Sequence, residues 1–408
     1  MGKGSIANIL LVTFLLWQIA TKFFSGSFFV EAIYPFVLVI LVGLNLHWLI
    51  RKSTFVFGTI IFLLLLFSVS SFNILSLKYI VSTFCSFYSF IIVYLSRPYI
   101  TIDNLSFTMK IVRLIIYISF IIMILTYLQV TGFGYESTDN LDQYSLGVKT
   151  RCSGIICVNV FSSFFSTSYE FVTTLFLSIL LITKIELFRN IDQRFEKLSK
   201  IAGPYSINCL VITSMAFLGD SRALNVFIIL AFLFPIFYKN FISFSKSKIS
   251  LSNISFLLSI ILFTIFLANI KIFLTMFNGI SRLIISSTER IGAFSRYPSF
   301  SLIGNGYTAN WLISGSEGSE YLIQGISIDL GLLGLLLLIF FISKMFLNIF
   351  NYILAKRTSF IYKYPSILAS FAVVALLFKA YTDIRSIGLG ILLGLFYINK
   401  NSSYGILE

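Results

Sequence analysis

The chain has 408 residues, of which 58% are hydrophobic and 11% are charged, and its mean hydropathy is +0.95. A soluble protein carries about 25% charged residues, so this composition excludes a soluble globular domain and indicates an all-α polytopic integral membrane protein. The net charge of +14 arises from 30 Lys and Arg against 16 Asp and Glu. In a membrane protein this excess is typical of basic cytoplasmic loops, not of a nucleic-acid partner.

Apolar runs long enough to cross a bilayer, about 20 residues each, recur along the chain. We predict about 12 transmembrane helices, at residues 6–24, 29–50, 53–72, 75–95, 112–132, 168–188, 203–219, 222–238, 250–271, 321–343, 364–381 and 385–398. No small-residue cleavage site follows the first run, so we expect an uncleaved helix there. Residues 153–165 are apolar but interrupted by Gly and Ser, which favours a re-entrant or interfacial segment. We therefore expect residues 1–408 to form a single transmembrane domain.

Histidine and cysteine give little support to a metal site. The cysteines are Cys85, Cys152, Cys157 and Cys209, with no CxxC pair among them. Cys152 and Cys157 are open to oxidation if they face the periplasm, although nothing in the sequence requires it. The single histidine, His47, is more readily explained as an interfacial residue than as a ligand, and we expect neither a zinc site nor a cofactor.

The distribution of Lys and Arg predicts the orientation of the chain. A cytoplasmic N-terminus places well over half of the 30 basic residues in cytoplasmic loops, so we predict that both termini lie inside. Two long loops then lie on the outer face, at residues 131–167 and 271–320. Any chemistry is accordingly expected outside, where nucleotide triphosphates are absent.

The loop at residues 271–320 is a polar segment between two apolar runs. Its charged residues include Arg282, Glu289, Arg290, Arg296, Glu317 and Glu320. Charged residues are costly beside a bilayer, so this cluster indicates a functional site at the membrane surface. The alternative is an ordinary solvated loop. Two further outward arginines are Arg222, in a short turn after Gly219, and Arg151, which opens the interrupted apolar segment.

Arginines above apolar walls suit a diphosphate attached to a lipid. The guanidinium group binds phosphate oxygens in bidentate fashion and keeps its charge. Arg222 and Arg290 are the strongest candidates for this role. The alternative for each outward arginine is an interfacial anchor that contacts lipid headgroups. The pair Asp383 and Arg385 is most simply a local ion pair in a tight turn.

The end of the polar segment carries a turn and a helix start. Gly304-Asn305-Gly306 permits a tight or left-handed turn close to a ligand. Glu320 stands where the next helix enters the membrane, and the helix dipole stabilises a carboxylate at that position. Glu320 is also explained as a helix cap with no chemical role.

The order of these features resembles that of the O-antigen polymerases (the Wzy type), within a superfamily that includes O-antigen ligases and shape-determining peptidoglycan polymerases. The matching motifs are Ser221-Arg222 at a periplasmic turn, Arg290, Gly304-Asn305-Gly306, and Glu320-Tyr321-Leu322 ahead of Gly331-Leu332-Leu333-Gly334. The ligases place a histidine about where Glu320 falls, so its absence favours a polymerase. Arg151 with Gly154 is similar to the start of an earlier periplasmic motif, but the Glu-Pro that often follows is missing.

The resemblance implies a GT-C-like, metal-independent glycosyltransferase in the bacterial inner membrane, with its active site facing the periplasm. It would join oligosaccharide repeat units carried on undecaprenyl diphosphate, among membrane lipid and with a separate chain-length regulator as partner. It implies catalytic roles for Arg222, Arg290 and Glu320. It also implies substrate-binding roles for Arg151, Arg282, Arg296, Glu317 and Tyr321. The alternatives are a lipid-linked oligosaccharide flippase and an O-antigen ligase.

Overall fold

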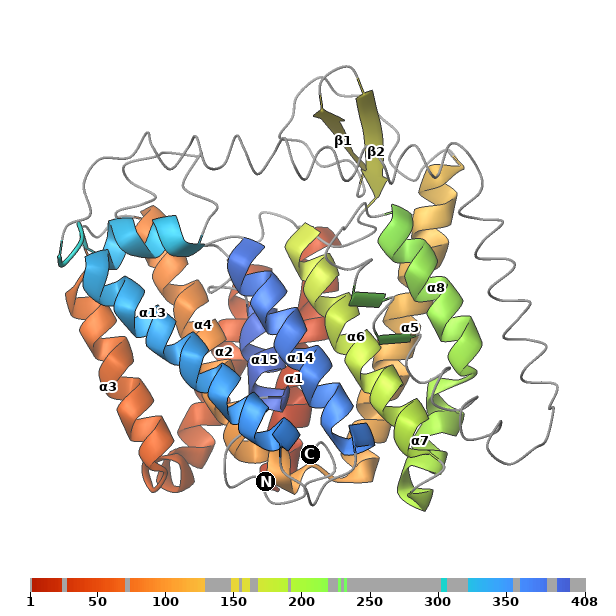
Figure 1. The fold of residues 1–408 in the computed structure, drawn as a ribbon, viewed down its shortest axis with the longest axis horizontal. Coiled ribbons are helices and arrows are strands. Elements are labelled where there is room, and N and C mark those ends of the chain that lie inside the picture. Colours follow the sequence, from red (N-terminus) through yellow and green to blue (C-terminus); the bar gives the residue numbers. More distant parts are fainter. Residues whose placement is uncertain are drawn as a thin grey trace.

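The computed structural model describes a helical bundle with one β-hairpin (Figure 1). The described residues are 2–23, 28–69, 74–128, 148–153, 156–161, 168–189, 192–218, 227–228, 231–232, 302–306, 322–354, 360–379 and 387–396. The helices up to residue 218 are α1 (Lys3–Phe23), α2 (Phe28–Ile50), α3 (Ser53–Phe67), α4 (Ile74–Ser96), the 3-10 turn η1 (Arg97–Tyr99), α5 (Ile102–Tyr127), α6 (Ser168–Phe188), α7 (Gln193–Ala202) and α8 (Tyr205–Leu218). The strands β1 (Val148–Ser153) and β2 (Ile156–Phe161) precede α6, and α13 (Leu322–Leu354), α14 (Phe360–Lys379) and α15 (Ile387–Phe396) follow.

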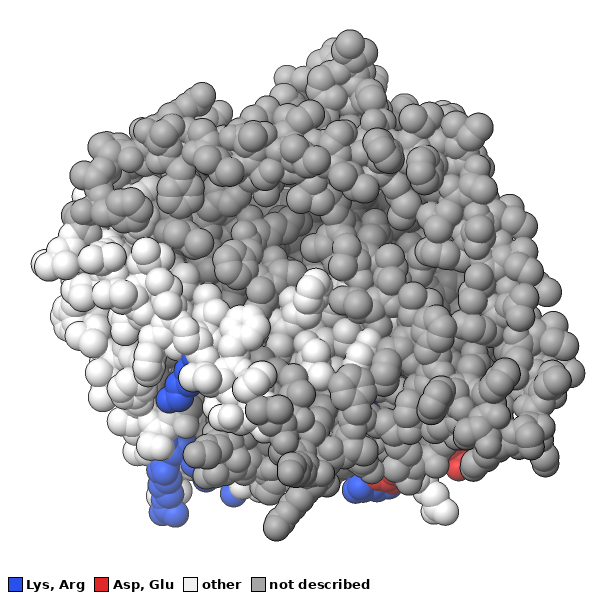
Figure 2. All heavy atoms as spheres, in the orientation of Figure 1, with Lys and Arg blue, Asp and Glu red and all other residues white. Residues whose placement is uncertain are grey.

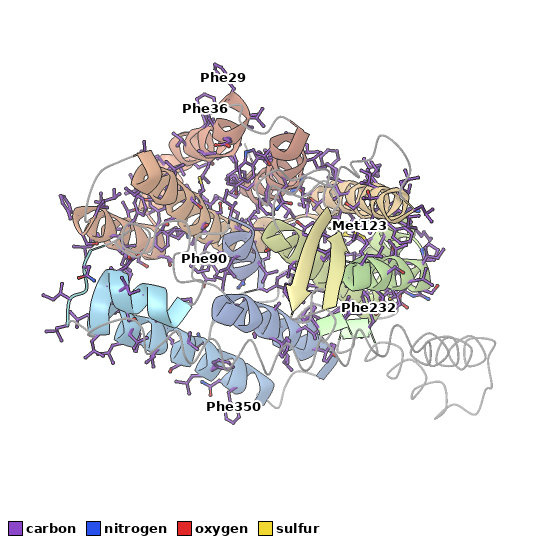
Figure 3. All side chains as sticks on the ribbon, turned by 90° about the horizontal axis from the view of Figure 1, so that it is seen from above. Phe29, Phe36, Phe90, Met123, Phe232 and Phe350 are labelled. Carbon is purple, nitrogen blue, oxygen red and sulfur yellow. The ribbon has the colours of Figure 1, made fainter. Side chains whose placement is uncertain are left out.

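The described helices are those of a multi-pass membrane protein. Six of them contain apolar segments long enough to span a bilayer, at Lys3–Thr21, Phe29–Ile50, Ile80–Tyr99, Ile102–Thr126, Phe171–Phe188 and Ile326–Asn348. Large apolar side chains cover the outside of the bundle, for example Phe29 at 82% and Phe36 at 65% exposure, and both project outward in Figure 3. Apolar side chains turned outward over whole helices are stable in lipid, where their contact with water is removed.

Most predicted spans coincide with helices, and the differences have physical causes. The predictions at 29–50, 75–95 and 168–188 agree with α2, α4 and α6 to within one residue at each end. Helix α5 begins at Ile102, well before the predicted start at 112. Its first turns carry Asp103 and Lys110, so a search for apolar runs does not include them. The predicted spans at 222–238 and 250–271 lie largely or wholly outside the described residues.

The β-hairpin and helix α7 were not predicted. Within the expected re-entrant or interfacial segment at 153–165, residues 156–161 form strand β2 paired with β1, and the hairpin stands beyond the helix ends in Figure 1. Helix α7 is the second such element; it is amphipathic, with Phe195, Leu198 and Ala202 buried against the bundle. Its sequence alternates polar and apolar residues, so a search for long apolar runs does not detect it.

Basic residues gather at one end of the bundle, which we call the basic end. The ammonium group of Lys3 lies 5.6 Å from the ring centre of Trp48 and 5.0 Å from that of Tyr99, which joins the start of α1, the end of α2 and η1. Lys197 pairs with Asp103 at 3.3 Å, and Arg113 donates to the carbonyl of Ile201, which joins α7 to the start of α5. On the face in Figure 2 the blue side chains lie toward this end.

The N-terminus of α7 is capped and charged at the basic end. The carboxylate of Asp192 accepts the backbone N–H of Arg194 at 2.9 Å. It also accepts bonds from the guanidinium, of Nε to Oδ1 at 3.0 Å and to Oδ2 at 2.8 Å, and of Nη2 to Oδ2 at 2.6 Å. These side-chain bonds hold the pKa of Asp192 below its ordinary value. One turn on, the Lys200 ammonium lowers the pKa of Glu196 in the same way.

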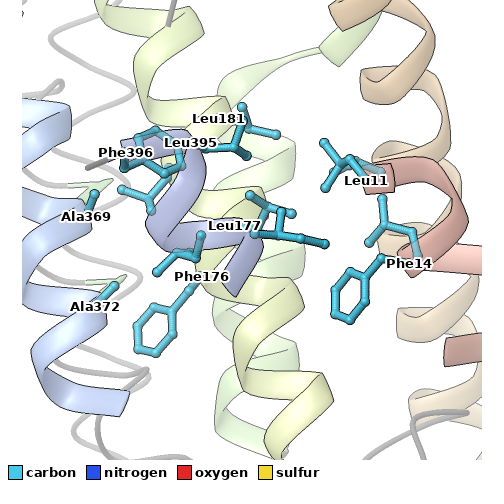
Figure 4. Packing of buried hydrophobic residues seen from close by; sticks show 14 of the residues in the cluster. Leu11, Phe14, Phe176, Leu177, Leu181, Ala369, Ala372, Leu395 and Phe396 are labelled. Carbon is cyan, nitrogen blue, oxygen red and sulfur yellow. The ribbon is translucent and has the colours of Figure 1, made fainter. Parts of the chain in front are cut away.

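Helix α15 occupies the centre of the bundle. It contacts α1, α4, α6 and α14, and nine of its residues are buried, although it is only 10 residues long. Figure 4 shows Leu395 and Phe396 of α15 between Ala369 and Ala372 of α14 and the side chains of α6, with Leu11 and Phe14 of α1 beyond. Glycines allow this close packing: a Cβ at Gly394 would lie 2.8 Å from the carbonyl oxygen of Phe90, and one at Gly390 would collide with the carbonyl of Ser86.

Three pairs of polar side chains inside the bundle join neighbouring helices. Thr174 of α6 donates to the amide oxygen of Gln18 of α1 at 2.7 Å, and Tyr34 of α2 bonds to Ser89 of α4 at the same distance. Thr108 of α5 donates to Asn8 of α1. Such bonds hold neighbouring helices in register where water is absent.

Candidate functional site at the break in helix α13

Helix α13 is interrupted at Gly331. This residue has φ of 65° and ψ of −157°, a conformation that glycine adopts readily and that other residues adopt at a cost. Figure 1 shows the first part of α13 lying across the end of the bundle and the longer second part running along it. The sequence predicted a continuous span over 321–343, whereas the helix is both broken and extended to Leu354.

A break in a helix leaves backbone groups without their usual partners, and residues 302–306 supply new ones. The N–H of Asn305 donates to the carbonyl of Ile328 at 2.9 Å, and that of Gly306 donates to the carbonyl of Asp329 at 3.0 Å. In return, the N–H of Leu333 donates to the carbonyl of Leu302 at 3.2 Å. Each such group left unpaired in lipid costs several kcal/mol, so the break and the segment that covers it require each other.

Gly304 makes this close approach possible. A Cβ on Gly304 would lie 2.5 Å from both the carbonyl oxygen of Asp329 and the backbone nitrogen of Gly331, which no real side chain tolerates. The φ angles are +80° at Gly304 and +97° at Gly306, so the predicted left-handed turn is present. The close approach that Gly304 permits is to the backbone of α13, and the ligand that the sequence suggested stays a prediction.

Asp329 is an acidic residue buried at the break. Its exposed fraction is 0%, and Ile326 and Gly334 beside it on the same helix are also buried. Ionisable residues within membrane helices are costly and commonly mark functional sites. Sequence reasoning placed Asp329 in the helix but did not foresee a buried carboxyl at a break; the signal was its position two residues before Gly331.

The described residues on either side of the segment 307–321 meet at the break. Gly306 is bonded to α13, and α13 begins at Leu322. The segment between them in the sequence carries Glu317, Glu320 and Tyr321. Their positions, and those of Arg222, Arg282, Arg290 and Arg296, lie outside the described residues.

Arg151 is described as part of β1, where it pairs with Val158 of β2. Alternate residues of a strand face opposite sides, so Lys149 and Arg151 share one face of the hairpin. The hairpin stands at the end of the bundle opposite the basic end, as the break in α13 also does (Figure 1). Two of the chain segments that the sequence assigned to the site thus lie at one end of the protein.

Metal ligands do not gather in the described part of the chain: no group of three His, Cys, Asp or Glu residues comes together there. Comparisons with protein-family models, with curated protein sequences and with solved structures found no match to this chain.

Proposed function

We propose that this protein is a membrane glycosyltransferase of the O-antigen polymerase type, with its site at the end of the bundle that carries the break in α13. The observation that carries the proposal is the junction of residues 302–306 with α13 around buried Asp329. In membrane proteins, non-helical backbone within a spanning segment is found where it is buried in protein or lines a cavity. The break in α13 therefore supports a binding site here over an ordinary solvated loop.

The proposed orientation places this end on the periplasmic side of the inner membrane. Lys3 of α1, Arg97 of η1 and the Lys and Arg residues of α7 gather at the opposite end, which supports a cytoplasmic location for that end under the positive-inside rule. Donor and acceptor are then a growing glycan and a single repeat unit, each carried on undecaprenyl diphosphate and each entering from the surrounding lipid.

The proposed reaction is a substitution at the anomeric carbon of the donor sugar. A hydroxyl of the acceptor forms the new C–O bond, the bond to undecaprenyl diphosphate breaks, and the leaving group takes the electron pair. Arg222 and Arg290 stabilise the charge that builds on the diphosphate, an effect worth about 2.7–4 kcal/mol for one such donor group. Glu320 accepts the proton of the attacking hydroxyl, and Glu317 is the second candidate for this base.

The remaining predicted residues take binding roles in this proposal. Arg151, on the same face of β1 as Lys149, together with Arg282 and Arg296, would hold the second diphosphate or the sugars. Tyr321, directly before α13, would pack against a sugar ring. A chain-length regulator is the expected protein partner, and the chemistry requires no metal or cofactor.

One experiment separates this proposal from a flippase and from a ligase. Lipopolysaccharide is analysed on a gel from cells that lack the gene and are complemented with wild type, Arg290→Ala or Arg194→Ala. We expect a single repeat unit on the core without the gene, and a ladder restored by wild type and by the basic-end control Arg194→Ala, but not by Arg290→Ala. Loss of every O-antigen band, the single repeat included, would indicate a flippase or ligase instead.

A further inference from the structure

We propose that Cys152 and Cys157 form a disulfide bond that clamps the β1–β2 hairpin. The register of the antiparallel pair places Cys152 directly opposite Cys157, with Arg151 opposite Val158 on one side and Ser153 opposite Ile156 on the other. Sequence separation alone left this pairing open, because two cysteines five positions apart are brought together only by a hairpin with this register.

The backbone geometry of such a pair suits the bond. Directly opposite residues in an antiparallel pair have Cα atoms about 4.5 Å or about 5.5 Å apart, depending on whether they exchange backbone hydrogen bonds. Both values fall within the range of about 4.4–6.8 Å over which disulfides bridge two residues. The inference therefore holds for either kind of pair.

The hairpin also has a physical need for a cross-link. Its sheet has two strands in the described part of the chain, and an isolated two-stranded hairpin is marginally stable in water. A register slip by one residue would exchange the two faces. A bond between Cys152 and Cys157 prevents that slip, and the alternation of the strand assigns it to the face opposite that of Lys149 and Arg151.

The oxidation is a thiol–disulfide exchange with an external partner. The two thiols lose two protons and two electrons as the S–S bond forms, and a dithiol–disulfide oxidoreductase of the periplasm accepts them as its own disulfide is reduced. The inference rests on the proposed outward location of the hairpin, and it does not depend on glycosyl transfer. Cys85 in α4 and Cys209 in α8 are free, so they serve as internal controls.

Differential alkylation tests the bond. The full-length protein is denatured in N-ethylmaleimide, reduced, and treated with a second maleimide of different mass before peptide mass spectrometry. We expect the second label on Cys152 and Cys157 and the first label on Cys85 and Cys209. The first label on all four cysteines would overturn the proposal.

A single substitution tests location and bond together. Spheroplasts that carry wild type or Cys157→Ser are treated with a membrane-impermeant maleimide. We expect Cys152 to be labelled in the variant, and in wild type only after reduction. Labelling of unreduced wild type would mean an outward hairpin without the bond, and no labelling even after reduction would place the hairpin elsewhere; either result overturns the inference. Failure of the polymerase proposal would leave all these labels unchanged, because they report on the hairpin alone.

Discussion

Gly306 donates its backbone N–H to the carbonyl oxygen of Asp329 across 3.0 Å, and this bond closes the chain on itself at the end of the bundle. It joins the segment at residues 302–306 to the break in α13. In the sequence, Glu317 and Glu320 fall between Gly306 and the start of α13 at Leu322, so the residues proposed for proton transfer belong to the chain next to this junction.

Replacement of Gly304 by alanine should open the junction. The new Cβ would lie 2.5 Å from two backbone atoms of α13, and a positive φ costs a non-glycine residue about 1–2 kcal/mol. We expect Gly304→Ala to lower the Tm in detergent and to abolish the polymer ladder. The matched control is Gly43→Ala on α2, where a Cβ meets no atom within 4 Å. Equal stability of both variants would contradict the described docking.

Replacement of Gly390 by alanine should destabilise the centre of the bundle. A Cβ at this position collides with the backbone carbonyl of Ser86, and overpacking of this kind costs about 1–3 kcal/mol. We expect a lower Tm for Gly390→Ala, measured by intrinsic fluorescence. Because the collision is with backbone, adding Ser86→Ala should not restore stability. Recovery in the double variant would show that the α4–α15 contact involves side chains instead.

The hydrogen bond between Thr174 and Gln18 should behave as a coupled pair. Thr174→Val leaves the buried amide oxygen of Gln18 without its partner, at a cost of about 1–3 kcal/mol, whereas the double variant Gln18→Leu/Thr174→Val removes both polar groups. We therefore expect the single change to lower the Tm and the double variant to regain most of the loss. Additive effects in a double-mutant cycle would mean that the two side chains do not interact.

Stability should depend on pH through the cap of α7. The pKa of Asp192 is lowered in the folded protein by its bonds to Arg194, so its stabilising effect is complete above the pKa of the unfolded chain and is lost as pH falls through the lowered folded value. We expect the difference in Tm between wild type and Asp192→Asn to stay constant near neutral pH and to shrink as pH falls below about 4, the ordinary pKa of an aspartate. Arg194→Gln removes the same bonds from the other side, so we expect it to give the same pH profile as Asp192→Asn. A loss of Tm in Asp192→Asn that does not change with pH would contradict this effect of the carboxylate charge.

The sequence predicted the helices that depend on an apolar run and missed the elements that depend on contact. Helices α2, α4 and α6 are uniform apolar stretches, so hydropathy located them to within one residue. The start of α5 and all of α7 carry charged residues between apolar ones. They are stabilised by packing on each other, and α7 also packs on α6. The short α15 was predicted as short, but its central position follows from Gly390 and Gly394 meeting α4, which the sequence alone does not show.

The candidate site shows the same division. Gly304-Asn305-Gly306 was recognised as a left-handed turn from its residue types, because φ above zero is a local property of the chain. The partner of this turn was not predicted, because the break at Gly331 arises from hydrogen bonds between residues far apart in sequence. The roles of Arg222, Arg290 and Glu320 stay predictions, since these residues lie outside the described part of the chain.

Glu320 is proposed as the base, and its substitution distinguishes chemistry from capping. Glu320→Gln keeps the shape of the side chain and a hydrogen-bonding oxygen but removes the negative charge that accepts a proton. General base assistance is worth about 10² to 10⁴ in rate, so we expect single-turnover glycosyl transfer to slow by this factor, with binding of the lipid-linked substrates little changed. Helix caps affect stability and not the chemical step. A variant with wild-type turnover and a lower Tm would therefore make Glu320 the cap of α13, and the base would have to be sought at Glu317.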